Sequence, residues 1–553
     1  MKLRTLAVLT LTTTVIAACS SPDQTENAKA SITEASIAEH VSVLADDSFM
    51  GRAPATEGEE KSVAYIIEQF EKIGLKPGMP NGSWTQDVPV MGQTTDRNTS
   101  LRITNGGREV MNVPYGNELV VSPAQDQESV NISNAELVFV GYGIVAPEEN
   151  WDDYKGLDVA GKILIMKNGN PVGGVDGFKG NSRLYYGRWS YKYEIAQELG
   201  AAGVLIIHTT ATAGYPWAVV GNSFGRERFT LMPESEERAP TQIAGWLGSR
   251  PSVELFETAG LNLEELMAAA DSADFQPVSL GNIRVNIELN ATYRTMMAKN
   301  VVGVVEGNDP IYKDEYVVFS AHHDHLGVGA PVEGDSIYNG AMDNASGTSG
   351  LINLANAFNM VKSDLKRSLM FVAVGAEESG LLGSKYFAQN PPVPAGAMSA
   401  NINTDMLSVF GRTRDVVSIG YGRTSIDPIL EEEAAKQGRV VIPDQQPEQG
   451  FFYRSDHFSF AKVGVPALYM DSGSDYIDKP EGHADWVTDY LRERYHTPLD
   501  NFDDTWDLSG TVEDLKLYFS VAYRIANAPE KMSWTSGNEF EAARIKALDE
   551  LNQ

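Results

Sequence analysis

The second half of the chain alternates short apolar runs with segments of helical periodicity. The apolar runs lie at 300–305, 316–320, 369–374, 400–403 and 467–470. The segments of helical periodicity lie at 346–360, 381–389, 426–437 and 511–527. Runs that are apolar at every position fit strands buried on both faces, and helices between such strands cover those faces. The pattern predicts an α/β fold, with a mostly parallel or mixed sheet sandwiched by helices.

Two amphipathic helices are expected much earlier in the chain. Apolar residues recur at helical spacing within 37–44 and again within 63–73, and a loop rich in turn formers, 46–58, separates the two segments. We interpret residues 32–116 as the first part of a domain that residues 283–553 complete.

The stretch between these two parts has a different character. Strand-like apolar runs occur at 135–143, 161–166 and 203–207, with one helical segment at 191–199. The string DDYKGLDVAGKILIMKNGNP resembles the protease-associated domain, a small β-rich insert that accompanies several secreted peptidases. We therefore expect residues 117–282 to form such an insert.

The N-terminus has the features of a secretory signal peptide. Lys2 and Arg4 precede an apolar stretch, 6–18, that is too short to span a bilayer. The residues before Cys19 resemble the lipobox of bacterial lipoproteins, and Cys19 is the only cysteine. This resemblance implies an extracytoplasmic protein with a lipid anchor at Cys19 and a tether over 19–31, in the outer membrane facing the periplasm or the cell surface. The alternative is a cleaved signal peptide, residues 1–18, with an incidental cysteine.

The composition narrows the class of protein. With 42% hydrophobic and 22% charged residues the chain fits a globular protein, and its formal charge of −31 argues against a nucleic-acid partner. A lone cysteine leaves no thiolate ligand set for a metal.

Imidazoles and carboxylates occur at strand ends and in loops of this last part of the chain. They fall at five places in the sequence: His322 with Asp324, Asp343, Glu377 with Glu378, Asp405, and His496. Imidazole and carboxylate without thiolate suit zinc, with manganese or cobalt as possible substitutes. Two histidines and three carboxylates are too many for one tetrahedral catalytic ion, but they suit two ions that share a bridging carboxylate.

This pattern resembles the dizinc exopeptidases typified by the bacterial leucyl aminopeptidases, whose relatives include glutamate carboxypeptidase II, the transferrin receptor and glutaminyl cyclase. The resemblance implies one zinc ion held by His322, Asp343 and Asp405, and a second held by Asp343, Glu378 and His496. It also implies that Glu377 is the general base, that Asp324 orients His322, and that Tyr453 donates to an oxyanion. His325 could contact the site or pack beneath it.

The function implied is that of a zinc aminopeptidase acting on peptides. A carboxypeptidase of the glutamate carboxypeptidase kind is the alternative within enzymes, and a receptor-like binding protein is the alternative outside them. The preferred side chain and the oligomeric state cannot be predicted from this sequence, because specificity pockets are built from loops.

Overall fold

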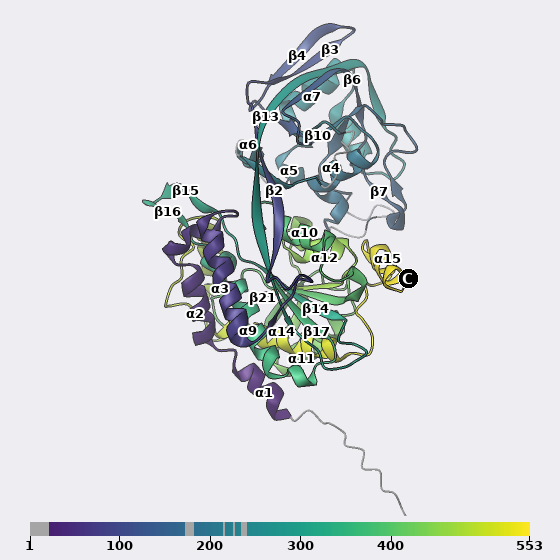
Figure 1. Ribbon diagram of the computed structural model, residues 1–553. Helices are drawn as coiled ribbons and strands as arrows, with labels where there is room; N and C mark the ends of the chain where they lie inside the picture. The colour runs from purple at the N-terminus through teal and green to yellow at the C-terminus, as the bar shows by residue number, and fades with distance from the viewer. Residues whose placement is uncertain are drawn as a thin grey trace, which may run out of the picture.

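The computed structural model describes residues 22–171, 178, 182–213, 216–224, 227–233 and 241–552. The predicted signal peptide and Cys19 lie outside these residues. The described part forms two lobes, and two long strands, β2 (Thr85–Thr95) and β13 (Val278–Val305), run from one lobe into the other (Figure 1). We call the lobe drawn below in Figure 1 the catalytic lobe and the lobe drawn above it the insert lobe.

The catalytic lobe is built on one mixed sheet. Its strands lie side by side in the order β20, β19, β21, β18, β14, β17, β13. They span Val440–Pro443 (β20), Asp415–Ile419 (β19), Ala467–Ser472 (β21), Met398–Asn403 (β18), Tyr316–His322 (β14) and Ser368–Val374 (β17). The central strands β17, β14, β18 and β21 are parallel, whereas β13 pairs antiparallel with β17. The predicted mixed α/β fold is confirmed.

Helices cover both faces of this sheet. They are α1 (Pro22–Ala30), α2 (Glu34–Leu44), α3 (Glu57–Ile73), α9 (Gly347–Met360), α10 (Leu382–Gln389), α11 (Asp427–Lys436), α12 (His457–Lys462), α13 (His483–Arg494), α14 (Ser509–Asn527) and α15 (Glu541–Leu551). Local sequence explains their ends: Thr33 and Ser36 form a capping box before α2, and Gly74 ends α3 in the left-handed conformation.

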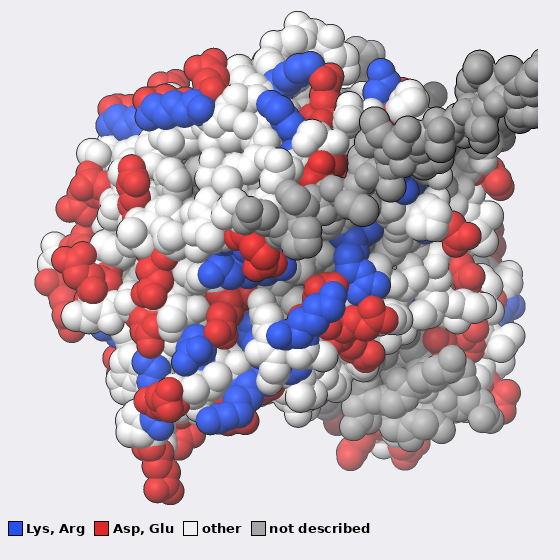
Figure 2. Space-filling view, turned by 90° about the horizontal axis from the view of Figure 1, so that it is seen from below, with Lys and Arg blue, Asp and Glu red and all other residues white. Residues whose placement is uncertain are grey.

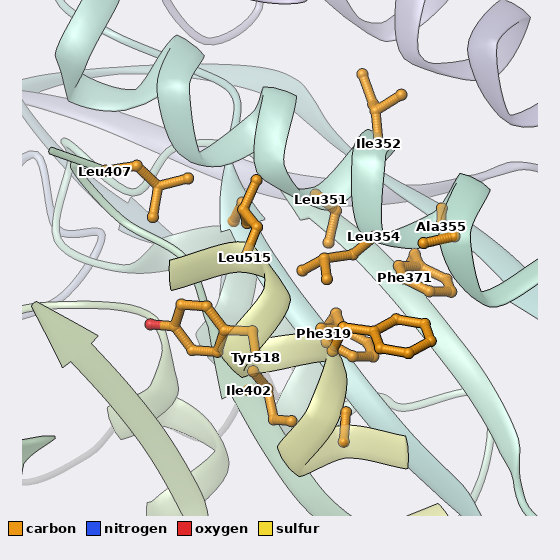
Figure 3. Packing of buried hydrophobic residues seen from close by; sticks show 14 of the residues in the cluster. Phe319, Leu351, Ile352, Leu354, Ala355, Phe371, Ile402, Leu407, Leu515 and Tyr518 are labelled. Atoms are coloured by element: carbon orange, nitrogen blue, oxygen red, sulfur yellow. The ribbon is translucent and has the colours of Figure 1, made fainter. Parts of the chain in front are cut away.

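Alternate residues of β14 enter two separate cores, which is why its apolar residues, 316–319, do not alternate with polar ones. Phe319 stacks on Phe371 of β17 at 4.9 Å between ring centroids, under α9 and α14 (Figure 3). Val318 points to the opposite face, into a cluster with Phe387 of α10 and Phe460 of α12. The stacked rings contribute about 1 kcal/mol beyond the area that they bury.

The insert lobe contains a second sheet. Its strands lie in the order β4, β3, β13, β6, β9, β10, β12, β5. They span Arg108–Pro114 (β4), Ser100–Asn105 (β3), Ser129–Phe139 (β6), Ile163–Lys167 (β9), Gly203–His208 (β10), Ile243–Gly248 (β12) and Leu119–Pro123 (β5). Its helices are α4 (Trp189–Glu198), α5 (Thr210–Ala213), α6 (Trp217–Phe224), α7 (Ser249–Thr258) and α8 (Leu263–Ala269). Both β3 and β4 precede the predicted start of the insert at residue 117, and its predicted end at residue 282 falls inside β13.

The smaller strands lie outside these two runs. They are β1 (Lys76–Pro77), β7 (Val145–Ala146), β8 (Trp151–Asp152), β11 (Arg228–Leu231), β15 (Gly327–Val332) and β16 (Asp335–Tyr338). Among the described residues, no helix is both long enough and apolar enough to cross a membrane. On the face shown in Figure 2, Lys and Arg side chains lie interspersed with Asp and Glu.

A polar contact joins the two lobes. Lys462 of α12 forms an ion pair with Glu194 of α4 at 2.9 Å, and the Tyr185 backbone N–H donates to Glu539 at 3.0 Å. The Tyr185 ring also lies against Phe458, with 5.4 Å between centroids. This contact is independent of the strands that connect the lobes.

Candidate metal centre

Three parallel strands of the catalytic lobe end in the predicted ligands. β14 ends at His322, β17 is followed by Glu377 and Glu378, and β18 is followed by Asp405. Because β14 pairs in parallel with both neighbours, their carboxyl ends meet at one edge of the sheet. The strand order therefore assembles residues that lie 83 positions apart in the sequence.

Asp343 and His496 reach this edge from outside the sheet. Asp343 lies in an irregular turn just before α9, and its peptide bond to Asn344 is cis. Asp500 holds this turn, because its carboxylate accepts from the backbone N–H groups of Met342 and Asp343 at 3.0 and 3.1 Å. His496 follows α13 with a φ of 57°, an uncommon backbone conformation for a residue with a side chain.

The distances show how Asp343 connects two groups of side chains. Its Oδ1 lies 3.2 Å from His322 Nε2, which is also 3.3 Å from Asp405 Oδ1. Its Oδ2 lies 3.2 Å from His496 Nε2, which is also 3.1 Å from Glu378 Oε2. Each oxygen of Asp343 thus belongs to a different group, as expected of a carboxylate that bridges two ions.

These separations fit zinc ligands. Two atoms that each bind one tetrahedral zinc ion at 2.0–2.1 Å are about 3.3 Å apart. The four distances of 3.1–3.3 Å match that value. Accessibility differs across the set, since 1% of the His322 side chain but 36% of the His496 side chain is exposed. The arrangement can hold metal and leave a position open to substrate, as catalytic zinc sites do.

The pKa values of the carboxylates at this site are shifted in opposite directions. Burial opposes ionisation of Asp343, but hydrogen bonds with His322 and His496 lower its pKa well below the ordinary value. Burial raises the pKa of Glu377 well above its ordinary value, and the charge of Glu378 adds to this effect while His322 opposes it. Asp343 is therefore ionised at neutral pH, whereas Glu377 has the higher proton affinity that general-base chemistry requires.

The predicted role of Asp324 needs a correction. Its carboxylate is 3.8 Å from His322 Nδ1, too far for a hydrogen bond, and the nearer acceptor is the Asp324 backbone carbonyl at 3.2 Å. The carboxylate instead accepts from the backbone N–H groups of Glu377 and Glu378, at 3.0 and 3.3 Å. Asp324 orients His322 through its main chain and positions the turn after β17 through its side chain.

The oxyanion role predicted for Tyr453 is not supported. Its side chain is fully buried, and its hydroxyl donates to Glu539 at 2.6 Å and accepts from Arg423 at 3.1 Å. The donor that an oxyanion would need is already used in this buried group. Two residues further on, Ser455 donates to Asp405 Oδ2 at 2.5 Å, so this segment does contact a predicted ligand.

Sequence reasoning missed Arg52, whose guanidinium is buried and has no carboxylate partner among the residues that the structure describes. It donates to the backbone carbonyls of His323, Asn339 and Gly340 at 2.8, 2.5 and 2.9 Å, and also to Leu44 at 2.6 Å. Burial lowers its pKa to about 10, so it stays charged at neutral pH. Arg52 ties the segment after β14 to the segment before Asp343. Two sequence signals include Arg52: the loop over 46–58, rich in turn formers, and the string GRAPATEGEEKSVAYI, which resembles a flanking motif of the exopeptidase family.

Comparison with known proteins agrees with the ligand pattern. The family model described as Peptidase family M28 matches residues 300–520, which include every predicted metal ligand. The resemblance to the dizinc exopeptidases, predicted from the sequence, is confirmed over this part of the chain.

Several curated proteins are similar to this chain in sequence, with identities of 24–28%. Leupeptin-inactivating enzyme 1 of Streptomyces exfoliatus is 28% identical over 214 residues, 37% of this chain and 44% of that protein. Leucine aminopeptidase 2 of Trichophyton rubrum is 26% identical over 257 residues, 44% of this chain and 46% of that protein. The Glutamate carboxypeptidase 2 homolog of Caenorhabditis elegans is 24% identical over 300 residues, 46% of this chain and 35% of that protein. The matches span less than half the length of these relatives.

Among solved structures, the aminopeptidase from Aneurinibacillus sp. strain AM-1 is 18% identical. The superposition covers 90% of this chain and 95% of that one, with a TM-score of 0.48.

Proposed function

We propose that the protein is a zinc-dependent aminopeptidase that removes residues from the N-terminus of peptides. The observation that carries the proposal is the placement of Asp343, with one carboxylate oxygen in each of two histidine–carboxylate groups. His322 and Asp405 complete one group, and Glu378 and His496 complete the other. Manganese or cobalt ions could substitute for zinc in such a ligand set.

The zinc ions, Glu377 and Asp324 would have different roles in the reaction. Zinc ions held here would supply Lewis acidity, which polarises a carbonyl and lowers the pKa of water. Glu377 would take a proton from water and deliver it to the leaving amine. Asp324 keeps Glu377 beside the ligands, because it fixes the backbone N–H of both glutamates.

The direction of cleavage is tested with one unmodified peptide of about ten residues. Soluble protein that starts after Cys19 is incubated with it, and fragments are followed by mass spectrometry with chelator and with added zinc. A chelator-sensitive ladder that shortens from the N-terminus supports the aminopeptidase. A ladder from the C-terminus supports a carboxypeptidase, the alternative within enzymes; one similar protein is named Glutamate carboxypeptidase 2 homolog. Two bound metals without cleavage of any peptide would favour a binding protein.

We also propose that the insert lobe is a protease-associated domain and that the protein is anchored at Cys19 outside the cytoplasm. The support for the anchor is the sequence around Cys19. Growth with a labelled fatty acid tests it: the wild type should carry label in the membrane fraction, and Cys19→Ser should not. Label in both proteins would exclude this anchor.

A further inference from the structure

His325 lies three residues beyond the predicted ligand His322, and its side chain is completely buried beside the metal centre. Its Nδ1 is 2.6 Å from Glu378 Oε1. His325, Asp343 and Glu378 also offer ligand atoms within 4.8 Å of one another, so proximity alone leaves two roles open for the histidine. It could bind a metal ion, or it could hold the glutamate that does.

The separation decides between these two roles. Ligands that share one tetrahedral zinc ion are about 3.3 Å apart, and His496 Nε2 meets this distance with Glu378 Oε2 at 3.1 Å. The 2.6 Å between His325 and Glu378 is too short for a shared ion and is typical of a strong hydrogen bond to a carboxylate. The two oxygens of Glu378 therefore have different partners: Oε1 faces His325 and Oε2 faces His496.

Close packing around the His325 ring favours the orientation in which its Nδ1 faces Glu378. A Cβ on Gly340 would lie 2.5 Å from His325 Cγ, so a larger residue at 340 would displace the ring. His325 Nε2 is buried and has no hydrogen-bond partner among the described residues. The ring is thus held by packing and by its one bond to Glu378, with Nδ1–H as the donor.

We infer that His325 is a positioning residue that selects the orientation in which Glu378 presents Oε2 to the second metal ion. Partners that hydrogen-bond to metal ligands typically contribute 10- to 100-fold in metal affinity. The first ion, held by His322 and Asp405 with Asp343, does not depend on this bond. The inference rests on the proposed function, since it assumes that the two groups bind zinc.

The test compares zinc binding by the wild type and by His325→Phe, which keeps a ring and removes the donor. Zinc content is measured after dialysis, and both dissociation constants are measured by competition with a chelating dye. We expect the second zinc ion to bind 10- to 100-fold more weakly and the first to change less than about twofold. His325→Asn should recover part of the loss, because its amide nitrogen occupies about the position of Nδ1.

A matched control replaces another buried histidine far from the centre. His208→Phe, in the insert lobe, makes the same chemical change and should bind both ions as the wild type does. X-ray absorption spectroscopy of the wild type with two zinc ions bound counts the imidazole ligands. This count does not depend on the stability of any variant. Two imidazoles per two ions are expected, from His322 and His496.

Three results would overturn the inference. These are unchanged affinities in His325→Phe, an equal loss of both ions, or a third imidazole ligand in the wild type. Failure of the proposed function gives a different result, because the wild type itself would then bind no zinc or cleave no peptide.

Discussion

The two lobes contain the same local arrangement with different chemistry at its end. In each, a central strand lies between two parallel neighbours and ends in a buried histidine, His322 on β14 or His208 on β10. Beside β14 the neighbouring strands lead to Glu377, Glu378 and Asp405. Beside β10 they lead to Lys167 and Gly248, and the His208 ring lies edge-on to Trp217 and Trp246.

This comparison shows that a histidine at a strand end is not informative by itself. Within the described residues, His208 belongs to neither of the two groups that could hold a metal ion. What makes His322 a candidate ligand is the identity of the residues that follow the two strands paired with its own. The residues that follow the neighbouring strands, rather than the histidine, distinguish the two strand ends.

The largest expected effect follows from removing the proposed base. Glu377→Gln should lower kcat for peptide hydrolysis by about 10²- to 10⁴-fold, because positioned general bases contribute about that much. Zinc content should stay unchanged, since Glu377 is not among the predicted ligands. The control is His208→Phe, which should keep the wild-type kcat. If Glu377→Gln retained full activity, the difference between the lobes would not lie in this residue.

Zinc should stabilise one lobe more than the other. Removal of metal with a chelator should abolish activity. Added zinc should restore it and, at about 100 times the Kd of each site, stabilise the fold by about 2.7 kcal/mol per bound ion. Hydrogen exchange measured by mass spectrometry should show increased protection at the ends of β14, β17 and β18. Strands β9, β10 and β12 should show no change, and equal protection of both sets would contradict a site confined to the catalytic lobe.

A smaller effect is expected from the buried cations, one in each lobe. Arg52→Met should destabilise the protein by about 3 kcal/mol, because several buried carbonyls lose their donor. Within the described ranges, Lys192 in the insert lobe donates to two carbonyls, of Gly169 and Tyr186, at 3.0 and 2.7 Å. Lys192→Met should therefore destabilise less, as measured by urea unfolding. The reverse order would show that Arg52 is not the main tie between the site segments.

The smallest effect, taken per pH unit, concerns the protonation of Lys192. Burial lowers the pKa of Lys192 from 10.5 to about 7, so between these values the unfolded chain holds a proton that the folded chain does not. Lowering the pH from about 10 to 7 should then destabilise the wild type relative to Lys192→Met, by at most about 1.4 kcal/mol per pH unit. Urea unfolding of both proteins at several pH values measures this difference. Parallel curves would mean that Lys192 stays charged.

Much of the catalytic lobe could be predicted from the sequence, because the residue pattern of its strands and helices agrees with the structure that each segment adopts. The apolar run at 369–374 became β17 and the helical segment at 346–360 became α9, each within a residue or two. The single long β13 could not be predicted, because it pairs with different strands in the two lobes and its burial alternates along much of its length. The periodicity of apolar residues depends on which faces of a segment are buried. In β13 the buried faces change along the strand.

The sequence by itself determined which residue types are available for the chemistry: two histidines and three carboxylates in order, with no thiolate. Tertiary structure decided what each does. It turned Tyr453 into a buried partner of Glu539, assigned the Asp324 carboxylate to a backbone turn, and placed His325 against Glu378. The physical reason is that a residue type limits which bonds a side chain can form, whereas the groups within about 3 Å of it decide which bond it forms.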